Sequence, residues 1–144
     1  MRIQLCYYKD YIERPKEPFS QINAVDYDLH AGTRMIYGDS AVGFFDKNDY
    51  LTYNRVNFGP SGSSTKIKVR YARGSSGGKI EIRLGGPQGQ LIGQFVTVNT
   101  GGWNKFSTKT IDINVQNVSG YQDLTFVGKE VDGLMNLSWF KLAP

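Results

Sequence analysis

Cysteine and histidine are almost absent from this chain. Its 144 residues include one cysteine, Cys6, and one histidine, His30. A single cysteine cannot close an internal disulfide, and one residue of each kind cannot build a thiolate or multi-histidine metal site. Cys6 lies in a charged N-terminal stretch and His30 in the turn-like sequence Asp28–Gly32, so both are interpreted as surface residues without a chemical role. The composition therefore excludes a disulfide scaffold and a zinc or iron enzyme.

Long apolar runs are also missing. No stretch approaches the roughly 18 apolar residues of a membrane span, and the N-terminal residues do not contain the apolar segment of a signal peptide. We therefore expect no membrane partner. If the natural protein is exported, its signal lies outside this sequence.

The charge balance is mildly basic. The 17 Lys and Arg residues against 13 Asp and Glu give a net charge of +4, which permits binding to an anionic polymer without indicating it. Five basic residues on two strand-like segments form a possible stripe: Lys66, Lys68, Arg70, Lys79 and Arg83. Glu81 interrupts this stripe. We interpret it as a solvated sheet face and expect no nucleic-acid partner.

Glycine and aromatic residues are abundant. The chain has 17 Gly, nine Tyr, eight Phe and two Trp, a combination that favours short strands joined by tight turns. Ile67, Val69 and Tyr71 alternate with basic residues, and residues 79–84 repeat the pattern, which is typical of strands with one buried face. Similar runs occupy residues 50–58, 91–98, 106–115, 121–127 and 134–142. The sequence therefore predicts an all-β fold, an antiparallel β-sandwich (jelly roll) of about eight to nine strands.

The first residues differ from the rest of the chain. Pro15 and Pro18 stand in a charged stretch without strand or helix periodicity, and proline holds itself and the residue before it in extended backbone. We interpret residues 1–19 as a linker or N-terminal arm and residues 20–144 as one module. Such an arm before a small domain indicates a larger parent protein.

The sequence does not predict a catalytic site. Two pairs of carboxylates are conceivable for work on a glycosidic bond, Asp46 with Asp49 and Glu81 with Asp123. They are not accompanied by an activated nucleophile or a metal cluster. An enzyme that uses Asp46, Asp49 or Glu81 stays open as an alternative, but the sequence favours a module without catalytic activity.

One tryptophan stands where a core residue is not expected. Trp103 follows Gly101 and Gly102 and precedes Asn104, so this stretch is interpreted as a turn. A large ring in a turn needs a ligand or a neighbour to cover it. Sugar rings have a face of C–H groups that lies well on an aromatic plane, and their hydroxyls pair with amide or carboxylate side chains. Trp103 therefore suggests carbohydrate binding, and the alternative is a ring that folds back to cap the sandwich.

Several short motifs follow one another in a characteristic order. They are Ile22–Asp28, Val42–Leu51, Tyr53–Gly59, Gly77–Leu84, Gly89–Gly93, Thr100–Trp103, Val118–Leu124 and Met135–Phe140. In this order and spacing the sequence resembles a family 6 carbohydrate-binding module, with Ile22–Asp28 corresponding to the opening strand of the family. The resemblance implies a jelly-roll sandwich attached to a secreted glycoside hydrolase.

The resemblance also implies a sugar site in the loops at one end of the sandwich. Trp103 matches the stacking tryptophan of the family, and Asn136 matches its hydrogen-bonding asparagine. Phe44 stands where the family usually has tyrosine, so the ring is kept and the hydroxyl is lost. Tyr37 and Asp39, shortly before Phe44, are expected to supply neighbouring contacts.

Some members of the family bind sugar in a second cleft, on the concave sheet face. Tyr50 matches the aromatic residue of that cleft and Glu81 its carboxylate. The alternative for both residues is ordinary sheet surface.

A structural calcium ion is the point at which this sequence departs from the family. The resemblance places acidic ligands of the ion at three positions that hold Asn23, Val25 and Ser138 here. Calcium is bound by six to eight oxygens, several of them from carboxylates. We therefore expect this site to be empty or weak, and we expect no other cofactor.

Together these features predict a non-catalytic, monomeric and extracellular module that targets an attached glycoside hydrolase to a plant or algal cell-wall polysaccharide. Xylan or xylo-oligosaccharide is the first expectation for the ligand, since many such modules accompany xylan-active enzymes. β-1,3-Glucan, mixed-linkage β-glucan and agar stay open as ligands. A sandwich that binds a protein and no sugar is the remaining alternative.

Overall fold

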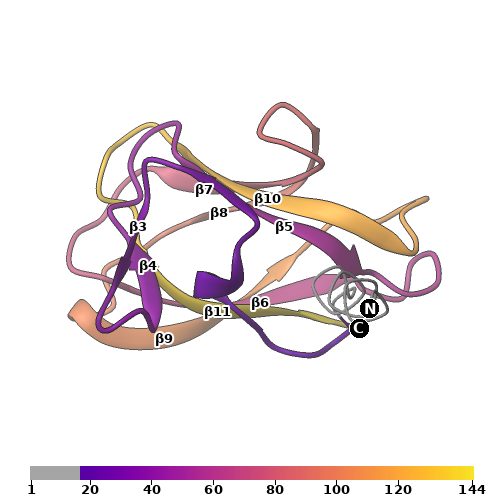
Figure 1. The fold of residues 1–144 in the computed structure, drawn as a ribbon, viewed down its shortest axis with the longest axis horizontal. Helices are drawn as coiled ribbons and strands as arrows, with labels where there is room; N and C mark the ends of the chain where they lie inside the picture. The colour runs from indigo at the N-terminus through magenta and orange to yellow at the C-terminus, as the bar shows by residue number, and fades with distance from the viewer. Residues whose placement is uncertain (1–16) are drawn as a thin grey trace, which may run out of the picture.

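Two antiparallel β-sheets pack face to face in the structure, a computed structural model that describes residues 17–144 (Figure 1). One sheet has six strands in the order β3–β4–β11–β6–β9, with β1 added beside β11. These strands are β1 (Ile22–Asn23), β3 (Arg34–Ile36), β4 (Ala41–Gly43), β6 (Lys66–Arg73), β9 (Gly102–Asp112) and β11 (Asn136–Ala143).

The second sheet has five strands in the order β2–β5–β10–β7–β8. These strands are β2 (Leu29–Ala31), β5 (Tyr50–Asn57), β7 (Lys79–Leu84), β8 (Gln90–Val96) and β10 (Tyr121–Lys129). A single turn of 3-10 helix, Ala24–Asp26, lies between β1 and β2. Within residues 17–144, no helix is long and apolar enough to span a membrane.

The predicted all-β antiparallel sandwich is confirmed, with eleven strands rather than eight to nine. The strands that the sequence did not resolve are β1 to β4, which have only two or three residues each. Alternation of polar and apolar residues cannot be recognised over so short a length. The expected opening strand is correspondingly brief, because Ile22–Asp28 holds β1 and the 3-10 turn. Most of the predicted arm, Cys6 included, lies outside the described residues.

The turn expected around His30 is wrong, and the possible basic stripe divides between the two sheets. His30 does not stand in a turn but in β2, where its Nδ1 is 3.1 Å from Thr33 Oγ1 and its ring centroid is 4.7 Å from that of Tyr27. The basic stripe is not continuous, because Lys66, Lys68 and Arg70 belong to β6 and Lys79 and Arg83 to β7. Strands β6 and β7 lie in different sheets, so the chain presents two separate basic strips.

The core forms between the two sheets as the alternation predicts. Ile67, Val69 and Tyr71 of β6 are buried, and Ile80 and Ile82 of β7 are buried opposite them. Burial of such side chains stabilises the fold by about 1.5–3 kcal/mol for each residue. The residues that alternate with them, such as Lys68 and Arg70 of β6, lie on the outer face of their sheet.

An aromatic cluster in the core contacts the 3-10 turn Ala24–Asp26. The rings of Tyr53, Phe126 and Phe140 meet edge to face, with centroids 4.8 to 6.1 Å apart. The Tyr53 hydroxyl is buried and donates a hydrogen bond of 2.7 Å to the carbonyl of Ala24. Burial raises the pKa of Tyr53 well above its usual value, so the hydroxyl stays a donor. This bond holds the 3-10 turn against the sandwich.

The ends of the sandwich differ in what they carry. Figure 1 shows the segment that leads into β1 and the end of β11 close together at one end. Strands β3 and β4 and the beginning of β9 lie toward the opposite end (Figure 1). The chain therefore enters and leaves on the side away from the loops that the sequence predicts as the site.

Tyr53→Phe tests the buried hydroxyl. Loss of the donor leaves the Ala24 carbonyl without its partner, so we expect the free energy of unfolding to fall by about 1–3 kcal/mol. Urea denaturation measures this change, and Tyr121→Phe, at an exposed tyrosine, is the matched control. Equal stability of the two variants would contradict the role given to Tyr53.

Candidate functional site

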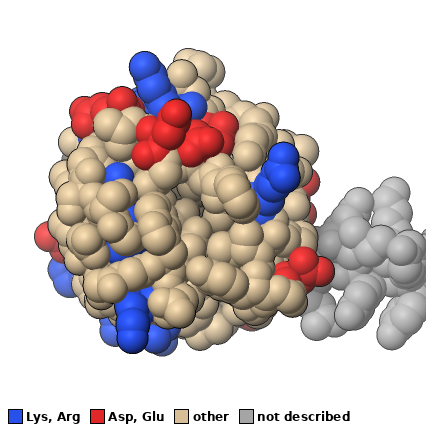
Figure 2. Space-filling view, turned by 90° about the vertical axis from the view of Figure 1, so that its left-hand side faces the viewer, with Lys and Arg blue, Asp and Glu red and all other residues tan. Residues whose placement is uncertain are grey.

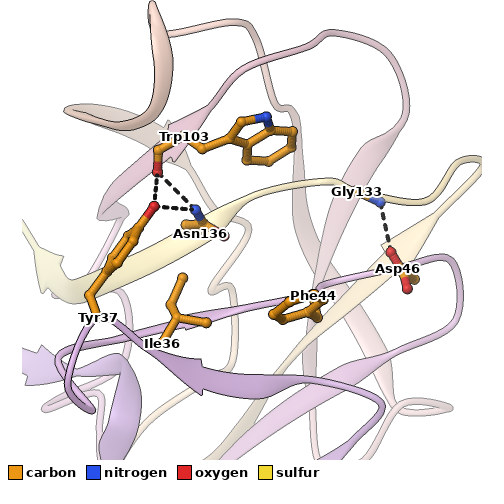
Figure 3. A pocket seen from close by; sticks show the side chains of 7 residues that line it. All are labelled: Ile36, Tyr37, Phe44, Asp46, Trp103, Gly133 and Asn136. Atoms are coloured by element: carbon orange, nitrogen blue, oxygen red, sulfur yellow. Dashed lines mark hydrogen bonds between the residues drawn. The ribbon is translucent and has the colours of Figure 1, made fainter.

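A cleft of about 380 Å³ opens between the loops at the end of the sandwich that carries β3 and β4. It is lined by Ile36, Tyr37, Phe44, Asp46, Trp103, Gly133 and Asn136 (Figure 3). These residues come from the ends of β3, β9 and β11 and from three connecting loops. The surface at this end of the molecule is mostly uncharged at its centre, with acidic side chains gathered along one border (Figure 2).

Four of the five predicted loop-site residues line this cleft: Tyr37, Phe44, Trp103 and Asn136. Asp39 lies in the turn between β3 and β4 and is not among the lining residues. The sequence did not single out Ile36 or Gly133. Ile36 could have been suspected as the neighbour of Tyr37, but Gly133 is remote in sequence and carries no side chain that would mark it.

Two exposed aromatic rings form the sides of the cleft. Trp103 is 42% exposed and Phe44 61% exposed, and Figure 3 shows the indole on one side and the phenyl ring on the other. The turn expected around Trp103 is wrong, because β9 begins at Gly102 and Gly102 pairs with Arg73 of β6. The indole is thus carried by a strand, which holds it more firmly than a turn would.

Phe44 is held in an uncommon conformation. It follows β4 directly and has a positive φ of 54°, which costs of order 1 kcal/mol in a residue with a side chain. The guanidinium of Arg34 lies 5.6 Å from the centroid of its ring, a favourable cation–π distance. Backbone geometry and the Arg34 contact together hold an apolar ring at the surface.

Asn136 lies between the two rings and is only 7% exposed. Its Nδ2 donates to the carbonyl of Trp103 at 2.8 Å and lies 3.5 Å from Tyr37 Oη, and the Tyr37 hydroxyl donates to the same carbonyl at 3.0 Å. A carbonyl can only accept, so the amide nitrogen must face it. Asn136 Oδ1 then has no hydrogen-bond partner within residues 17–144 and remains an acceptor for a ligand.

Gly43 makes room for this amide. A Cβ at Gly43 would lie 2.5 Å from Asn136 Oδ1 and 2.7 Å from Ile36 Cδ1. Both distances are shorter than any ordinary contact, so a larger residue here would push the amide or the isoleucine aside. Gly43 is therefore part of the site although it makes no hydrogen bond with a side chain.

The carboxylates of Asp46 and Asp49 hold the loops beside the cleft. Asp46 Oδ1 accepts a hydrogen bond of 2.8 Å from the backbone of Gly133, and Asp49 Oδ2 accepts one of 2.9 Å from the backbone of Asp46. Burial raises the pKa of Asp49, repulsion from Asp46 and Asp132 adds to this, and the hydrogen bond from Asp46 opposes it. Both carboxylates of this conceivable catalytic pair are thus engaged in loop structure.

The predicted second-cleft residues share the outer face of the five-stranded sheet. Tyr50 and Glu81 both stand opposite Val127 of β10, which separates them. Glu81 is 8% exposed, and its Oε1 forms an ion pair of 2.9 Å with Arg83 Nη2. The structure therefore places Tyr50 and Glu81 on one face, with the carboxylate already paired. Asp123, the proposed partner of Glu81, instead accepts a hydrogen bond from the backbone of Arg55 at 3.0 Å.

The positions of the family calcium do not fit that ion. Asn23 lies in β1 and its Oδ1 accepts from Gln21 at 3.0 Å, while the apolar Val25 packs against the core and Ser138 lies in β11. None of the three offers a carboxylate, and calcium requires several oxygen ligands that include them. Over residues 17–144, no group of three or more His, Cys, Asp or Glu is arranged to hold a metal.

Comparison with known proteins identifies a family. The model of the family 6 carbohydrate-binding modules matches residues 19–144. The chain is 31% identical over 137 residues to endo-1,4-β-xylanase A of Thermoclostridium stercorarium, a match that covers 92% of the chain and 20% of that protein. The chain therefore spans only about a fifth of the length of this relative.

Solved structures give the same result. A β-1,3-glucan-binding family 6 module from Bacillus halodurans matches with a TM-score of 0.79 and 35% identity, covering 90% of this chain and 99% of that one. A family 6 module from Clostridium cellulolyticum in complex with xylose matches with a TM-score of 0.77 and 35% identity, covering 88% and 98%. Fold, sequence and family model together show that the chain belongs to the family 6 carbohydrate-binding modules, which bind without catalysing a reaction.

Proposed function

We propose that the cleft holds one sugar unit of a polysaccharide between the rings of Trp103 and Phe44. The observation that carries this proposal is the pair of exposed rings on either side of a cleft that Asn136 also lines, with an amide oxygen that has no hydrogen-bond partner within residues 17–144. The C–H faces of a pyranose would cover both rings and remove apolar surface from water. A sugar hydroxyl would donate to Asn136 Oδ1 and so set the orientation of the ring.

Charge favours a neutral ligand. Asp46 is the one charged residue among the seven that line the cleft, and repulsion from Asp46 and Asp132 contributes to the raised pKa of Asp49. An acidic sugar placed beside Asp46 would face a like charge. Xylose, glucose and agar sugars carry no charge and avoid this cost.

Xylan or a xylo-oligosaccharide is the proposed ligand. The relative named as an endo-1,4-β-xylanase and the module solved with xylose support this choice. The module that binds β-1,3-glucan supports β-glucan as the second candidate, and mixed-linkage glucan and agar are the further ones. Phe44 cannot supply the hydroxyl of the usual tyrosine, so the ligand is held on that side by stacking alone.

The module would act by bringing an attached glycoside hydrolase to its polysaccharide outside the cell, as a monomer. The chain enters and leaves at the end of the sandwich away from the cleft (Figure 1), so a catalytic domain joined there would leave the cleft open. The outer face with Tyr50 and Glu81 is a weaker second candidate for sugar binding, because the Glu81 carboxylate is paired with Arg83. A protein ligand is the alternative that a failure to bind any polysaccharide would favour.

Trp103→Ala is the direct test of the cleft. Loss of the indole removes one of the two stacking faces, and we expect the affinity for xylohexaose or laminarihexaose to fall by about 100-fold or more. Isothermal titration calorimetry measures the affinity, and Tyr121→Ala, which removes an exposed ring on another part of the surface, is the control. If Trp103→Ala binds as tightly as the wild type, the sugar lies at another place.

Gly43→Ala tests whether the position of the Asn136 amide matters for sugar binding. The added methyl group would meet Asn136 Oδ1, so we expect affinity to fall by about tenfold, as for loss of one hydrogen bond to a ligand. Gly86→Ala is the control, because a Cβ there meets no atom within 4 Å. An affinity of Gly43→Ala within twofold of the control would show that the amide does not contact the ligand.

Calcium removal tests the family metal site. Because Asn23, Val25 and Ser138 provide no carboxylate, we expect the melting temperature to be the same with excess Ca²⁺ and with a chelator. Differential scanning calorimetry on the same sample before and after chelation measures it. A rise of many degrees with Ca²⁺, reversed by chelator, would overturn this expectation.

A further inference from the structure

Arg73 is a buried cation next to the cleft. It is the last residue of β6 and only 1% exposed. It forms no ion pair with any residue of the described chain, and burial lowers the pKa of its guanidinium. A buried charge without a counter-ion is costly, so its retention in this position calls for a physical reason.

The guanidinium joins two loops. Arg73 Nη1 donates to the carbonyl and hydroxyl of Thr97, at 2.8 and 2.6 Å, and to the carbonyl of Gly77. Arg73 Nε lies 3.3 Å from Ser75 Oγ. The loop between β6 and β7 is thereby bound to the segment between β8 and β9. The planar guanidinium presents the donors of Nη1 and Nε in one fixed fork, so a single side chain reaches both loops.

The backbone of Arg73 adds a second link to the same segment. Its N–H donates to Thr100 Oγ1 at 2.9 Å, and its carbonyl accepts from the N–H of Thr100 at 2.9 Å. Arg73 also pairs with Gly102, after an irregularity in the ladder between β6 and β9. Each of these bonds fixes the chain one to three residues before Trp103.

Gly74, the next residue, lies directly against the indole. A Cβ at Gly74 would be 2.5 Å from Trp103 Nε1 and 2.6 Å from its Cδ1. The other end of the ring lies near Gly133, where a Cβ would be 3.8 Å from Trp103 Cη2. The indole is therefore packed against the backbone of residue 74, which directly follows Arg73 in the chain.

We propose that Arg73 is a positioning residue for sugar binding, which holds Gly74 and the segment before Trp103 so that the indole faces the cleft. The proposal rests on the function proposed for the cleft. Arg73 does not line the cleft and acts only through Trp103. In this proposal a residue behind the cleft aligns one of the two aromatic rings on which the sugar stacks.

Arg73→Met tests the proposal, with Arg70→Met as the matched control on the exposed face of the same strand. Calorimetry with xylohexaose and laminarihexaose gives the affinity per folded molecule, well below the melting temperature of each variant. We expect Arg73→Met to bind about tenfold or more weakly and Arg70→Met to bind as the wild type. A residue that serves only stability would lower the melting temperature and leave this affinity unchanged, which would overturn the proposal.

Tryptophan fluorescence reports the surroundings of the Trp103 ring in the folded protein, which a change in global stability alone does not alter. In a Trp139→Phe background the emission comes from Trp103 alone, since the chain has two tryptophans. We expect Arg73→Met to shift the emission of the unliganded protein, and Gly74→Ala, which displaces the ring without touching the guanidinium, to shift it as well. The double variant Arg73→Met/Gly74→Ala should bind no more weakly than the weaker of the two single variants, because both substitutions act on the position of the same indole ring. Additive losses would overturn the proposal.

Thr97→Val keeps the test decisive if Arg73→Met does not fold. It removes one acceptor of the guanidinium in a buried residue of the same shape, and we expect a smaller loss of affinity, about two- to fivefold, with the same spectral shift. Wild-type affinity and an unchanged spectrum in this variant would overturn the proposal. If the wild type binds neither these two sugars nor mixed-linkage glucan or agar oligosaccharides, the proposed function fails, and the emission spectra alone then decide whether Arg73 positions Trp103.

Discussion

The backbone carbonyl of Trp103 is the point on which the cleft depends. It accepts hydrogen bonds from Asn136 at 2.8 Å and from Tyr37 at 3.0 Å, and so joins β9 to β11 and to the turn after β3. The same bonds turn the amide so that Asn136 Oδ1 is left for a ligand. One acceptor thus aligns an aromatic ring, an amide and a neighbouring hydroxyl, which are 33 to 99 residues apart in sequence.

The scaffold supports this arrangement by leaving space as well as by making bonds. Gly43 leaves room for the amide, and Gly74 and Gly133 lie against opposite ends of the indole. The buried guanidinium of Arg73, behind Trp103, joins two loops and has no acidic partner within residues 17–144. Preorganisation of this kind would lower the entropic cost of the proposed sugar binding, because the ring and the amide already hold their positions. In that proposal, stacking supplies the free energy and the amide supplies direction.

The sequence predicts most of the fold because polar and apolar residues alternate along long strands such as β6. Ile67 and Val69 point inward as their spacing indicates, whereas strands of two or three residues gave no pattern to recognise. In the cleft, residue type and resemblance identified Trp103 and Asn136. The indole was expected in a turn because two glycines precede it, but the ladder between β6 and β9 extends to Gly102. The role of Gly43 depends on a contact across strands that no local pattern reveals.

A crystal structure of the module with xylohexaose or laminarihexaose tests the central claim most directly. The account predicts a pyranose ring between Trp103 and Phe44, with one of its hydroxyls within hydrogen-bond distance of Asn136 Oδ1. The indole and the amide should keep the positions that they have without ligand. A sugar bound instead on the outer face beside Tyr50 and Glu81, with the cleft between Trp103 and Phe44 empty, would contradict it.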